Sequence, residues 1–130
     1  IRALKKSPLL SMFWANEVEL GWFFKSRYIL SLSGYDTGSN FLMAANSNSV
    51  VMKESDGWDL FYTNEFRPWE HFIPLELGAL DVKEKLDWAR SNPSSCKDMI
   101  QASQQVCSKF ASRINRTEIL RNVFSASFQD

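Results

Sequence analysis

A stretch of mostly small and polar residues with the sequence GYDTGSN separates a short apolar segment from a helix-prone one. It consists of Gly34, Tyr35, Asp36, Thr37, Gly38, Ser39 and Asn40. The two glycines permit positive φ and a close approach of a ligand to the backbone. The side chains of Thr37, Ser39 and Asn40 add short hydrogen-bond donors near the first N–H groups of the expected helix. This loop is therefore chemically suited to a phosphate or diphosphate, and it needs no lysine.

The same residue types also make ordinary turns and helix caps. Asp36 could simply close an Asx turn. Its carboxylate is an unfavourable neighbour for a diphosphate unless it faces sugar hydroxyls or the backbone. The loop matches neither the Walker sequence nor the Rossmann GxGxxG pattern. Its residues alone leave both a phosphate site and a structural turn open.

The loop is predicted to lie inside a β-α-β unit. Residues 27–33 indicate a buried strand covered on both faces, residues 41–46 suit a short helix, and residues 49–53 indicate a second buried strand. A right-handed crossover makes these strands parallel, and ligands in such sheets bind beyond the carboxyl ends of the strands. A third strand is expected at 71–75, where Pro74 favours a strand end or a sheet edge.

The last fifty residues are predicted to be helical. Asp81 with Glu84 resembles a capping box, and Asn92-Pro93 separates that helix from a longer one. The apolar stripe expected on the longer helix is Cys96, Met99, Ile100, Ser103, Val106, Cys107, Phe110 and Ile114. Asn115 with Glu118 could cap a third helix. Strands followed by helices, with one β-α-β unit, indicate an α/β domain.

Composition limits the classes of function. The chain has 130 residues, enough for one domain, and 45% of them are hydrophobic. Fifteen basic residues balance fifteen acidic ones, so no overall field recruits nucleic acid or anionic lipid. The apolar region near the start is interrupted by Pro8, Glu17 and Glu19. It is therefore shorter than the roughly 20 uninterrupted apolar residues that a membrane span needs. Because the chain starts at Ile1 without a signal-peptide pattern, it is predicted to be a fragment.

The cysteines give no metal or disulfide signal. Cys96 and Cys107 are eleven residues apart, which on one helix separates them by about 16 Å along the axis. A disulfide needs Cα atoms within about 7 Å, so two buried thiols are expected. Neither cysteine has zinc-type spacing or clusters with the single histidine, His71, and no metal site is predicted.

Five motifs follow one another between residues 27 and 90. They are a tyrosine-containing strand running into Gly34, SNSVV at 47–51, FY at 61–62, PWEHFIP at 68–74 and the DVKEKLDWAR helix at 81–90. In this order and spacing they resemble the C-terminal part of glycosyltransferase family 90. That family holds protein O-glucosyltransferases and O-xylosyltransferases, fungal capsule-associated xylosyltransferases and bacterial lipopolysaccharide-core transferases.

The resemblance implies the Rossmann-like C-terminal half of a GT-B type glycosyltransferase, with a short parallel sheet followed by C-terminal helices. Residues 27–130 would form this donor-binding domain, as a fragment of a larger protein, and residues 1–26 a linker or packing segment. The implied reaction transfers a sugar from a nucleotide diphosphate sugar, by analogy a UDP-sugar, to a hydroxyl of a glycan or protein, with inversion. Loop 34–40 falls on the family's diphosphate-binding loop, although many eukaryotic members have an arginine near Asn40.

The catalytic residues are not predicted in this chain. The resemblance places the general base in an N-terminal half-domain that this chain does not contain, so the isolated fragment is expected to be inactive. The secondary candidates for donor contacts are Ser47, Asp59, Glu65 and His71. Asp59 or Glu65 could accept hydrogen bonds from a ribose or be solvated surface charges. His71 could reach the cleft or be structural beside Trp69, an expected core residue, and Ser47 also suits a turn cap.

The remaining predictions concern partners and compartment. The nucleotide-sugar is a co-substrate, no cofactor is predicted, and metal dependence stays open. Asn115-Arg116-Thr117 is a glycosylation sequon, compatible with the secretory pathway. The implied compartment is the endoplasmic reticulum or Golgi lumen in a eukaryote, or the cytoplasm or a membrane-associated site in a bacterium. Competing hypotheses are a non-catalytic carbohydrate- or protein-binding module that keeps the fold, and an unrelated nucleotide-binding α/β domain.

Overall fold

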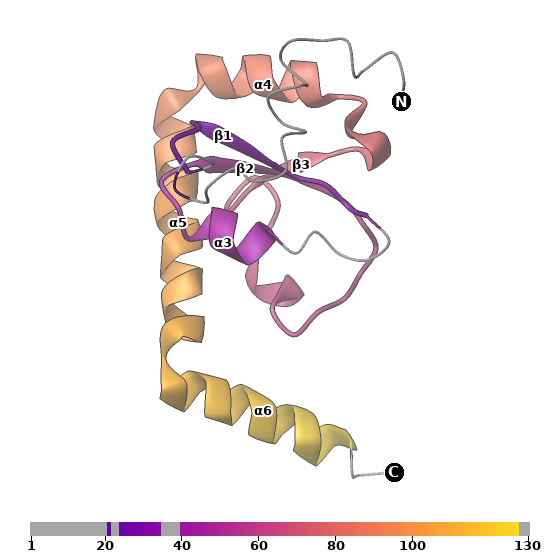
Figure 1. Cartoon of the computed structure of the whole chain (residues 1–130), viewed down its shortest axis with the longest axis vertical. Coiled ribbons are helices and arrows are strands. Elements are labelled where there is room, and N and C mark those ends of the chain that lie inside the picture. Colours follow the sequence, from indigo (N-terminus) through magenta and orange to yellow (C-terminus); the bar gives the residue numbers. More distant parts are fainter. Residues whose placement is uncertain (1–20, 22–23, 35–39, 128–130) are drawn as a thin grey trace.

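A computed structural model describes residues 21, 24–34 and 40–127. The elements are β1 (Tyr28–Ser31), α3 (Phe41–Ala45), β2 (Val50–Glu54), the 3-10 helix η2 (Thr63–Glu65), β3 (Ile73–Leu75), the 3-10 helix η3 (Leu77–Ala79), α4 (Val82–Ser91), α5 (Pro93–Ala111) and α6 (Arg113–Ser127). The strands form a parallel sheet in the order β1-β2-β3. In Figure 1, α4 lies above this sheet and α3 below it, while α5 runs down past both. The predicted α/β class, with a short parallel sheet and C-terminal helices, is confirmed.

The predicted β-α-β unit is present. β1 pairs with β2 in parallel, with Ile29 opposite Val51, and α3 makes the crossover. The apolar sequence of β2 is explained by its central place, because a middle strand covered by helices is buried on both faces. β1 is different: Ile29 is buried, whereas Leu30 and Leu32 are 42% and 44% exposed. The prediction that both faces of this strand are covered was therefore wrong, because the side chains of Leu30 and Leu32 are left exposed.

Side chains that alternate along β2 build two hydrophobic clusters. Val51 joins Ile29 and a group of aromatic rings in one cluster, together with Val106 of α5. Val50 and Met52 join the other cluster, which contains Ile73, Leu75, Ala89, Cys96 and Met99. The long helix α5 contributes side chains to both clusters, so this one helix packs against residues from both faces of the sheet.

The third strand is shorter than predicted. Residues 71–75 were expected to be extended, but β3 covers only Ile73–Leu75. Pro74 lies opposite Lys53 in the register with β2, on a strand at the sheet edge, as predicted. Trp69, expected in the core, is half-exposed and has φ of 64°. Its ring instead contacts that of Trp88 on α4, with centroids 4.9 Å apart, and Trp88 is partly buried against the second hydrophobic cluster.

The predicted capping box at the start of α4 is wrong. Asp81 does precede the helix, but its side chain makes no capping hydrogen bond. Its Oδ1 accepts a hydrogen bond from the Glu76 N–H at 2.9 Å, and Oδ2 lies 3.4 Å from Lys85 Nζ. The hydrogen bond from Glu76 is the main cause of a lowered pKa for the Asp81 carboxyl. Asp81 thus holds the η3–α4 connection rather than the first turn of the helix.

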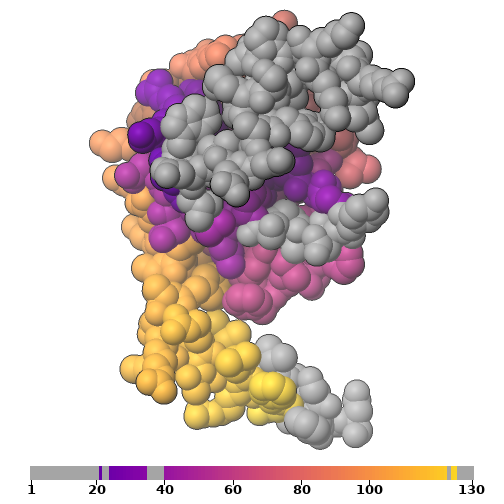
Figure 2. All heavy atoms as spheres, in the orientation of Figure 1, coloured from indigo at the N-terminus to yellow at the C-terminus, as the bar shows by residue number. Residues whose placement is uncertain are grey.

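The last two helices differ from prediction at their junction. Pro93 begins α5 as expected, but this helix ends at Ala111, and Ile114 is an exposed residue of α6. Asn115 lies inside α6 rather than at its cap, where Ser112 Oγ accepts a hydrogen bond from the Asn115 N–H at 3.5 Å. Figure 2 shows α6 (yellow) projecting beyond the rest of the molecule. Because α6 packs mainly on α5, its residues Ile114, Leu120 and Phe124 are exposed.

Both cysteines behave as predicted. Cys96 and Cys107 are free and buried on α5. Burial disfavours the charged thiolate and raises the pKa of each thiol. They serve as small apolar side chains in the two hydrophobic clusters.

The described part of the chain contains no helix with the length and hydropathy needed to cross a membrane. The predicted linker or packing segment at residues 1–26 falls mostly outside the described residues, and so do residues 35–39 of the loop. The division of the chain at residue 26 stays a prediction.

Candidate functional site

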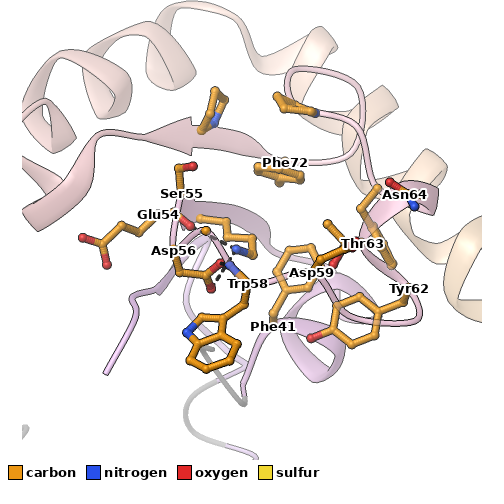
Figure 3. Close-up of a pocket in the computed structure, with 15 residues that line it drawn as sticks. Phe41, Glu54, Ser55, Asp56, Trp58, Asp59, Tyr62, Thr63, Asn64 and Phe72 are labelled. Carbon is orange, nitrogen blue, oxygen red and sulfur yellow. Dashed lines mark hydrogen bonds and ion pairs between the residues drawn. The ribbon is translucent and has the colours of Figure 1, made fainter. Parts of the chain in front are cut away.

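A cavity of about 470 Å³ lies beyond the carboxyl end of β2, beside β3 (Figure 3). Its floor contains four aromatic rings, those of Phe41, Tyr62, Phe66 and Phe72. All four are buried, and the Phe41 ring meets those of Phe66 and Phe72 edge-on, with centroids 5.0 and 5.7 Å away. The floor is therefore apolar and held by ring packing, in the position where parallel sheets bind ligands.

The connection that follows β2 forms the polar rim of this cavity. Lys53 Nζ donates to the Glu54 carbonyl at 3.0 Å and to Asp56 Oδ2 at 3.1 Å, and it lies 5.7 Å above the Phe41 ring. Asp56 Oδ1 also accepts a hydrogen bond from the Trp58 N–H at 3.2 Å. Trp58 itself is 52% exposed. Asp56 thus folds the connection back so that Trp58 and Asp59 reach the cavity.

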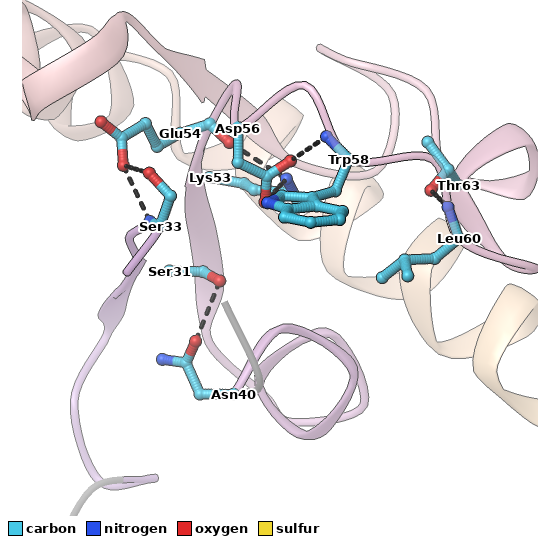
Figure 4. A network of polar contacts seen from close by, with 9 residues as sticks. All are labelled: Ser31, Ser33, Asn40, Lys53, Glu54, Asp56, Trp58, Leu60 and Thr63. Atoms are coloured by element: carbon cyan, nitrogen blue, oxygen red, sulfur yellow. Dashed lines mark hydrogen bonds and ion pairs between the residues drawn. The ribbon is translucent and has the colours of Figure 1, made fainter. Parts of the chain in front are cut away.

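Glu54, the last residue of β2, links both neighbouring loops, and Figure 4 shows its contact with Ser33. One carboxylate oxygen, Oε2, accepts hydrogen bonds from the Ser33 N–H at 2.8 Å and from the Ser33 hydroxyl. The other, Oε1, accepts one from the Gly78 N–H in η3, where φ is 79°. The side-chain hydrogen bond from Ser33, followed by that from Gly78, lowers the pKa of Glu54, which is only 4% exposed. The residue was not among the predicted candidates, although a carboxylate ending an apolar strand was a visible signal.

The ends of the predicted diphosphate loop are described, but its middle is not. Gly34 is exposed, whereas Tyr35, Asp36, Thr37, Gly38 and Ser39 lie outside the described residues. At the other end, Asn40 Oδ1 accepts a hydrogen bond from Ser31 Oγ at 2.9 Å, and Asn40 Nδ2 donates to the Leu30 carbonyl at 3.0 Å. The side chain of Asn40 therefore fastens the start of α3 to β1. The binding of a diphosphate by this loop stays a prediction.

The structure separates the four secondary candidates. Asp59 is exposed and lines the cavity. Glu65 is exposed on η2 outside the lining, with Oε2 3.4 Å from Lys109 Nζ. Ser47 Oγ donates to the Ala44 carbonyl at 2.6 Å and accepts from the Ser49 N–H at 3.1 Å, which is the turn-capping arrangement. His71 is buried and also lies outside the lining. Of the four, Asp59 alone is brought to the cavity.

His71 has a structural environment. Its Nδ1 accepts a hydrogen bond from the Arg67 N–H at 2.9 Å, and its carbonyl accepts one from the Ser103 hydroxyl on α5. The ring also packs against Phe66 at a centroid distance of 5.7 Å. These contacts tie the turn before β3 to the long helix.

Replacing His71 with alanine is expected to lower the free energy of unfolding by about 1–3 kcal/mol, because the Arg67 N–H loses its acceptor. Urea unfolding followed by circular dichroism would measure the change. His71→Asn, which keeps a side-chain acceptor near Arg67, should recover part of it. An unchanged midpoint in His71→Ala would contradict a structural role.

Among residues 21, 24–34 and 40–127, no group of three or more His, Cys, Asp or Glu side chains is arranged to hold a metal ion.

Residues 10–114 match glycosyl transferase family 90. The chain belongs to this family. Among its relatives is protein O-glucosyltransferase 3 of Rattus norvegicus, 31% identical over 83 residues, which are 63% of this chain and 16% of that protein. Protein O-glucosyltransferase 2 of Danio rerio is 30% identical over 83 residues, 64% of this chain and 17% of that protein. Uncharacterized protein 179R of Invertebrate iridescent virus 6 is 21% identical over 126 residues, 92% of this chain and 10% of that protein.

The resemblance to family 90 drawn from the motifs is thus confirmed, and family membership supports glycosyl transfer in general terms. The chain spans less than a fifth of each of these three relatives. What the whole protein does is therefore a matter for proposal.

Proposed function

We propose that the chain is the donor-binding part of a glycosyltransferase that moves a sugar from a nucleotide diphosphate sugar to a hydroxyl of a glycan or protein. A UDP-sugar donor and inversion at the anomeric carbon are part of this proposal, as is a Rossmann-like half of a GT-B fold. The observation that carries it is the cavity beyond the carboxyl end of β2, in a chain of family 90. Two relatives named protein O-glucosyltransferase support it.

In this proposal the diphosphate binds to loop 34–40 rather than in the cavity. Among the described residues, the cavity lining carries Glu54, Asp56 and Asp59 and one cation, Lys53, which is unfavourable for a phosphate. Loop N–H groups and the hydroxyls of Thr37 and Ser39 would stabilise the negative charge that develops on the leaving nucleotide. The acceptor hydroxyl needs a general base. That base is proposed to lie in an N-terminal half-domain that pairs with this one, so this chain alone would not catalyse transfer.

The test is the affinity for UDP, measured by isothermal titration calorimetry on the chain and on a Thr37→Ala, Ser39→Ala double variant. Loss of two hydrogen bonds to a charged ligand should weaken binding about tenfold or more. Ser47→Ala is the matched control, because its hydroxyl caps the turn after α3 and should leave UDP affinity unchanged. Equal affinity of the double variant and the wild type would contradict the loop assignment. Failure of the wild type to bind UDP, with binding of a plain oligosaccharide, would favour the non-catalytic module.

The compartment is proposed from the sequon at Asn115 alone. Asn115 is exposed on α6, and its Nδ2 donates to the Lys109 carbonyl at 3.1 Å. An N-glycan on this nitrogen would place the protein in the endoplasmic reticulum or Golgi lumen.

A further inference from the structure

A second cavity, of about 300 Å³, lies at the amino ends of the strands. Its lining includes Tyr28 and Val50, the first residues of β1 and β2, which are paired in the parallel register. Residues from the first turns of α5 line it as well. It shares no described lining residue with the cavity beyond β2, and loop 34–40 follows the opposite, carboxyl end of β1. The second cavity is therefore a separate place on the molecule.

Among the described residues, the charged side chains that line the second cavity are two cations. Arg27 directly precedes β1 and Lys97 lies on α5, and both are exposed. Neither makes an ion pair or a side-chain hydrogen bond in the described part of the chain. Burial raises the pKa of the Cys96 thiol in the same lining, and the positive charge of Arg27 opposes that rise, so the guanidinium acts on the interior of the cavity. A described lining with a formal charge of +2, from two cations and no carboxylate, attracts an anion.

The amide of Asn48 adds a neutral hydrogen-bond donor to this cavity. Its Oδ1 accepts a hydrogen bond from Gln104 Nε2 at 3.0 Å, and the same Nε2 donates to the Ser47 carbonyl at 3.0 Å. The Asn48 oxygen is thus occupied, whereas its Nδ2 makes no hydrogen bond within the described residues. Arg27 is placed by the backbone, because its carbonyl accepts a hydrogen bond from the Val50 N–H at 3.0 Å. The cavity therefore has donors on two held segments and on a long helix.

These donors favour a phosphate group over a carboxylate. A guanidinium offers a planar fork of N–H groups, an ammonium a point charge and an amide a further N–H. A phosphate monoester has three terminal oxygens to accept from all of them, whereas a carboxylate has two. The amino end of α5, where Pro93 is the first residue, adds partial positive charge near the same lining.

The rest of the lining suits an apolar body attached to the phosphate. Tyr28, Val50, Pro93 and Ile100 contribute a ring and aliphatic side chains. A volume of about 300 Å³ is at the lower end of the range of small-molecule pockets, so there is room for a small ring beside the phosphate group.

We propose that the second cavity binds a small phosphate monoester. Arg27, Lys97 and Asn48 Nδ2 contact the phosphate oxygens, and the apolar lining contacts the group that carries the phosphate. This site goes beyond the proposed function, because the donor is assigned to the carboxyl ends of the strands and the monoester to their amino ends.

The experiment is an amide NMR titration of the chain with phenyl phosphate, inorganic phosphate and phenol, which gives both the affinity and the place of binding. We expect saturable shifts of the Asn48 and Lys97 signals, with phenyl phosphate bound more tightly than inorganic phosphate or phenol. Arg27→Gln and Lys97→Gln should each weaken phenyl phosphate binding about tenfold, since a charged hydrogen bond is lost, and Lys97→Arg should retain most of the affinity. Arg121→Gln is the matched control, because Arg121 is an exposed cation on α6 outside the lining.

Four results would overturn the proposal. They are the absence of saturable shifts at the lining of the wild type, affinity that both glutamine variants leave unchanged, phenol bound as tightly as phenyl phosphate, and inorganic phosphate bound as tightly as phenyl phosphate. The third would contradict the anionic class and the fourth the role of the apolar lining. Both replaced side chains are exposed, so urea unfolding midpoints should match the wild type. If Arg27→Gln failed to fold, Lys97→Gln against Lys97→Arg would still decide the question.

Discussion

Replacement of Phe41 with alanine is expected to lower the free energy of unfolding by about 3–5 kcal/mol. The side chain is 1% exposed, and its ring contacts those of Tyr62, Phe66 and Phe72. These rings come from separate parts of the long connection between β2 and β3, so they cannot collapse together onto the space left by the missing ring. A change of this size is a large fraction of the 5–15 kcal/mol that stabilises a typical domain.

Urea unfolding of the variant, followed by circular dichroism, measures this effect. Phe41→Leu should lose less, because it keeps part of the buried volume. Phe124→Ala is the matched control: that side chain is 59% exposed on α6, and its removal should change stability by less than about 0.5 kcal/mol. Equal effects of Phe41→Ala and Phe124→Ala would show that the aromatic floor of the cavity is not part of the stable core.

The β-α-β unit could be predicted because its signal is local. Two β-branched or apolar runs flank a helix-prone segment, and the short connection leaves few ways to arrange them. The exposure of Leu30 and Leu32 could not be predicted from the same run. A continuous apolar run does not say whether both faces of its strand are covered, since that depends on which other parts of the chain pack above and below the sheet.

The cavity was less accessible to prediction. Asp59 was a candidate by residue type, but so were Glu65 and His71, and only the folded connection between β2 and β3 separates them. Residues 55–72 have little regular structure beyond η2, so no period assigns their side chains to a face. Tyr62, Phe66 and Phe72 come together because they pack on Phe41 of α3, a contact made across the chain.

The hydrogen bonds of Glu54 are the clearest example of contacts that could not be predicted from the sequence. Its hydrogen-bond partner Ser33 is 21 residues away along the chain, and its partner Gly78 is 24 residues away. Nothing local pairs these residues. The parallel sheet brings them together, because the carboxyl ends of β1, β2 and β3 meet at one edge.

Replacement of Glu54 with glutamine is expected to lower Tm by several degrees at neutral pH. In the wild type both carboxylate oxygens accept hydrogen bonds, Oε2 from Ser33 and Oε1 from Gly78. Glutamine has one oxygen and one NH₂ group, so in either orientation a donor faces either the Ser33 N–H or the Gly78 N–H. One partly buried backbone donor then loses its acceptor. Glu84→Gln is the matched control, since Glu84 is exposed on α4 and its replacement should leave Tm unchanged.

The pH dependence of this Tm difference follows from the pKa of Glu54. Hydrogen bonds from Ser33 and Gly78 lower that pKa in the folded protein below the ordinary value of 4.5. A carboxylate of this kind stabilises the fold fully above its unfolded pKa, and the stabilisation is lost as the pH falls through the folded pKa. The Tm difference between wild type and Glu54→Gln should therefore be widest at neutral pH and narrow below about pH 4.5. Asp81, whose pKa is also lowered, is present in both proteins, so its contribution cancels in the difference. A difference that stays constant across this range would mean that the charge of Glu54 is not what holds Ser33 and η3 against the end of β2.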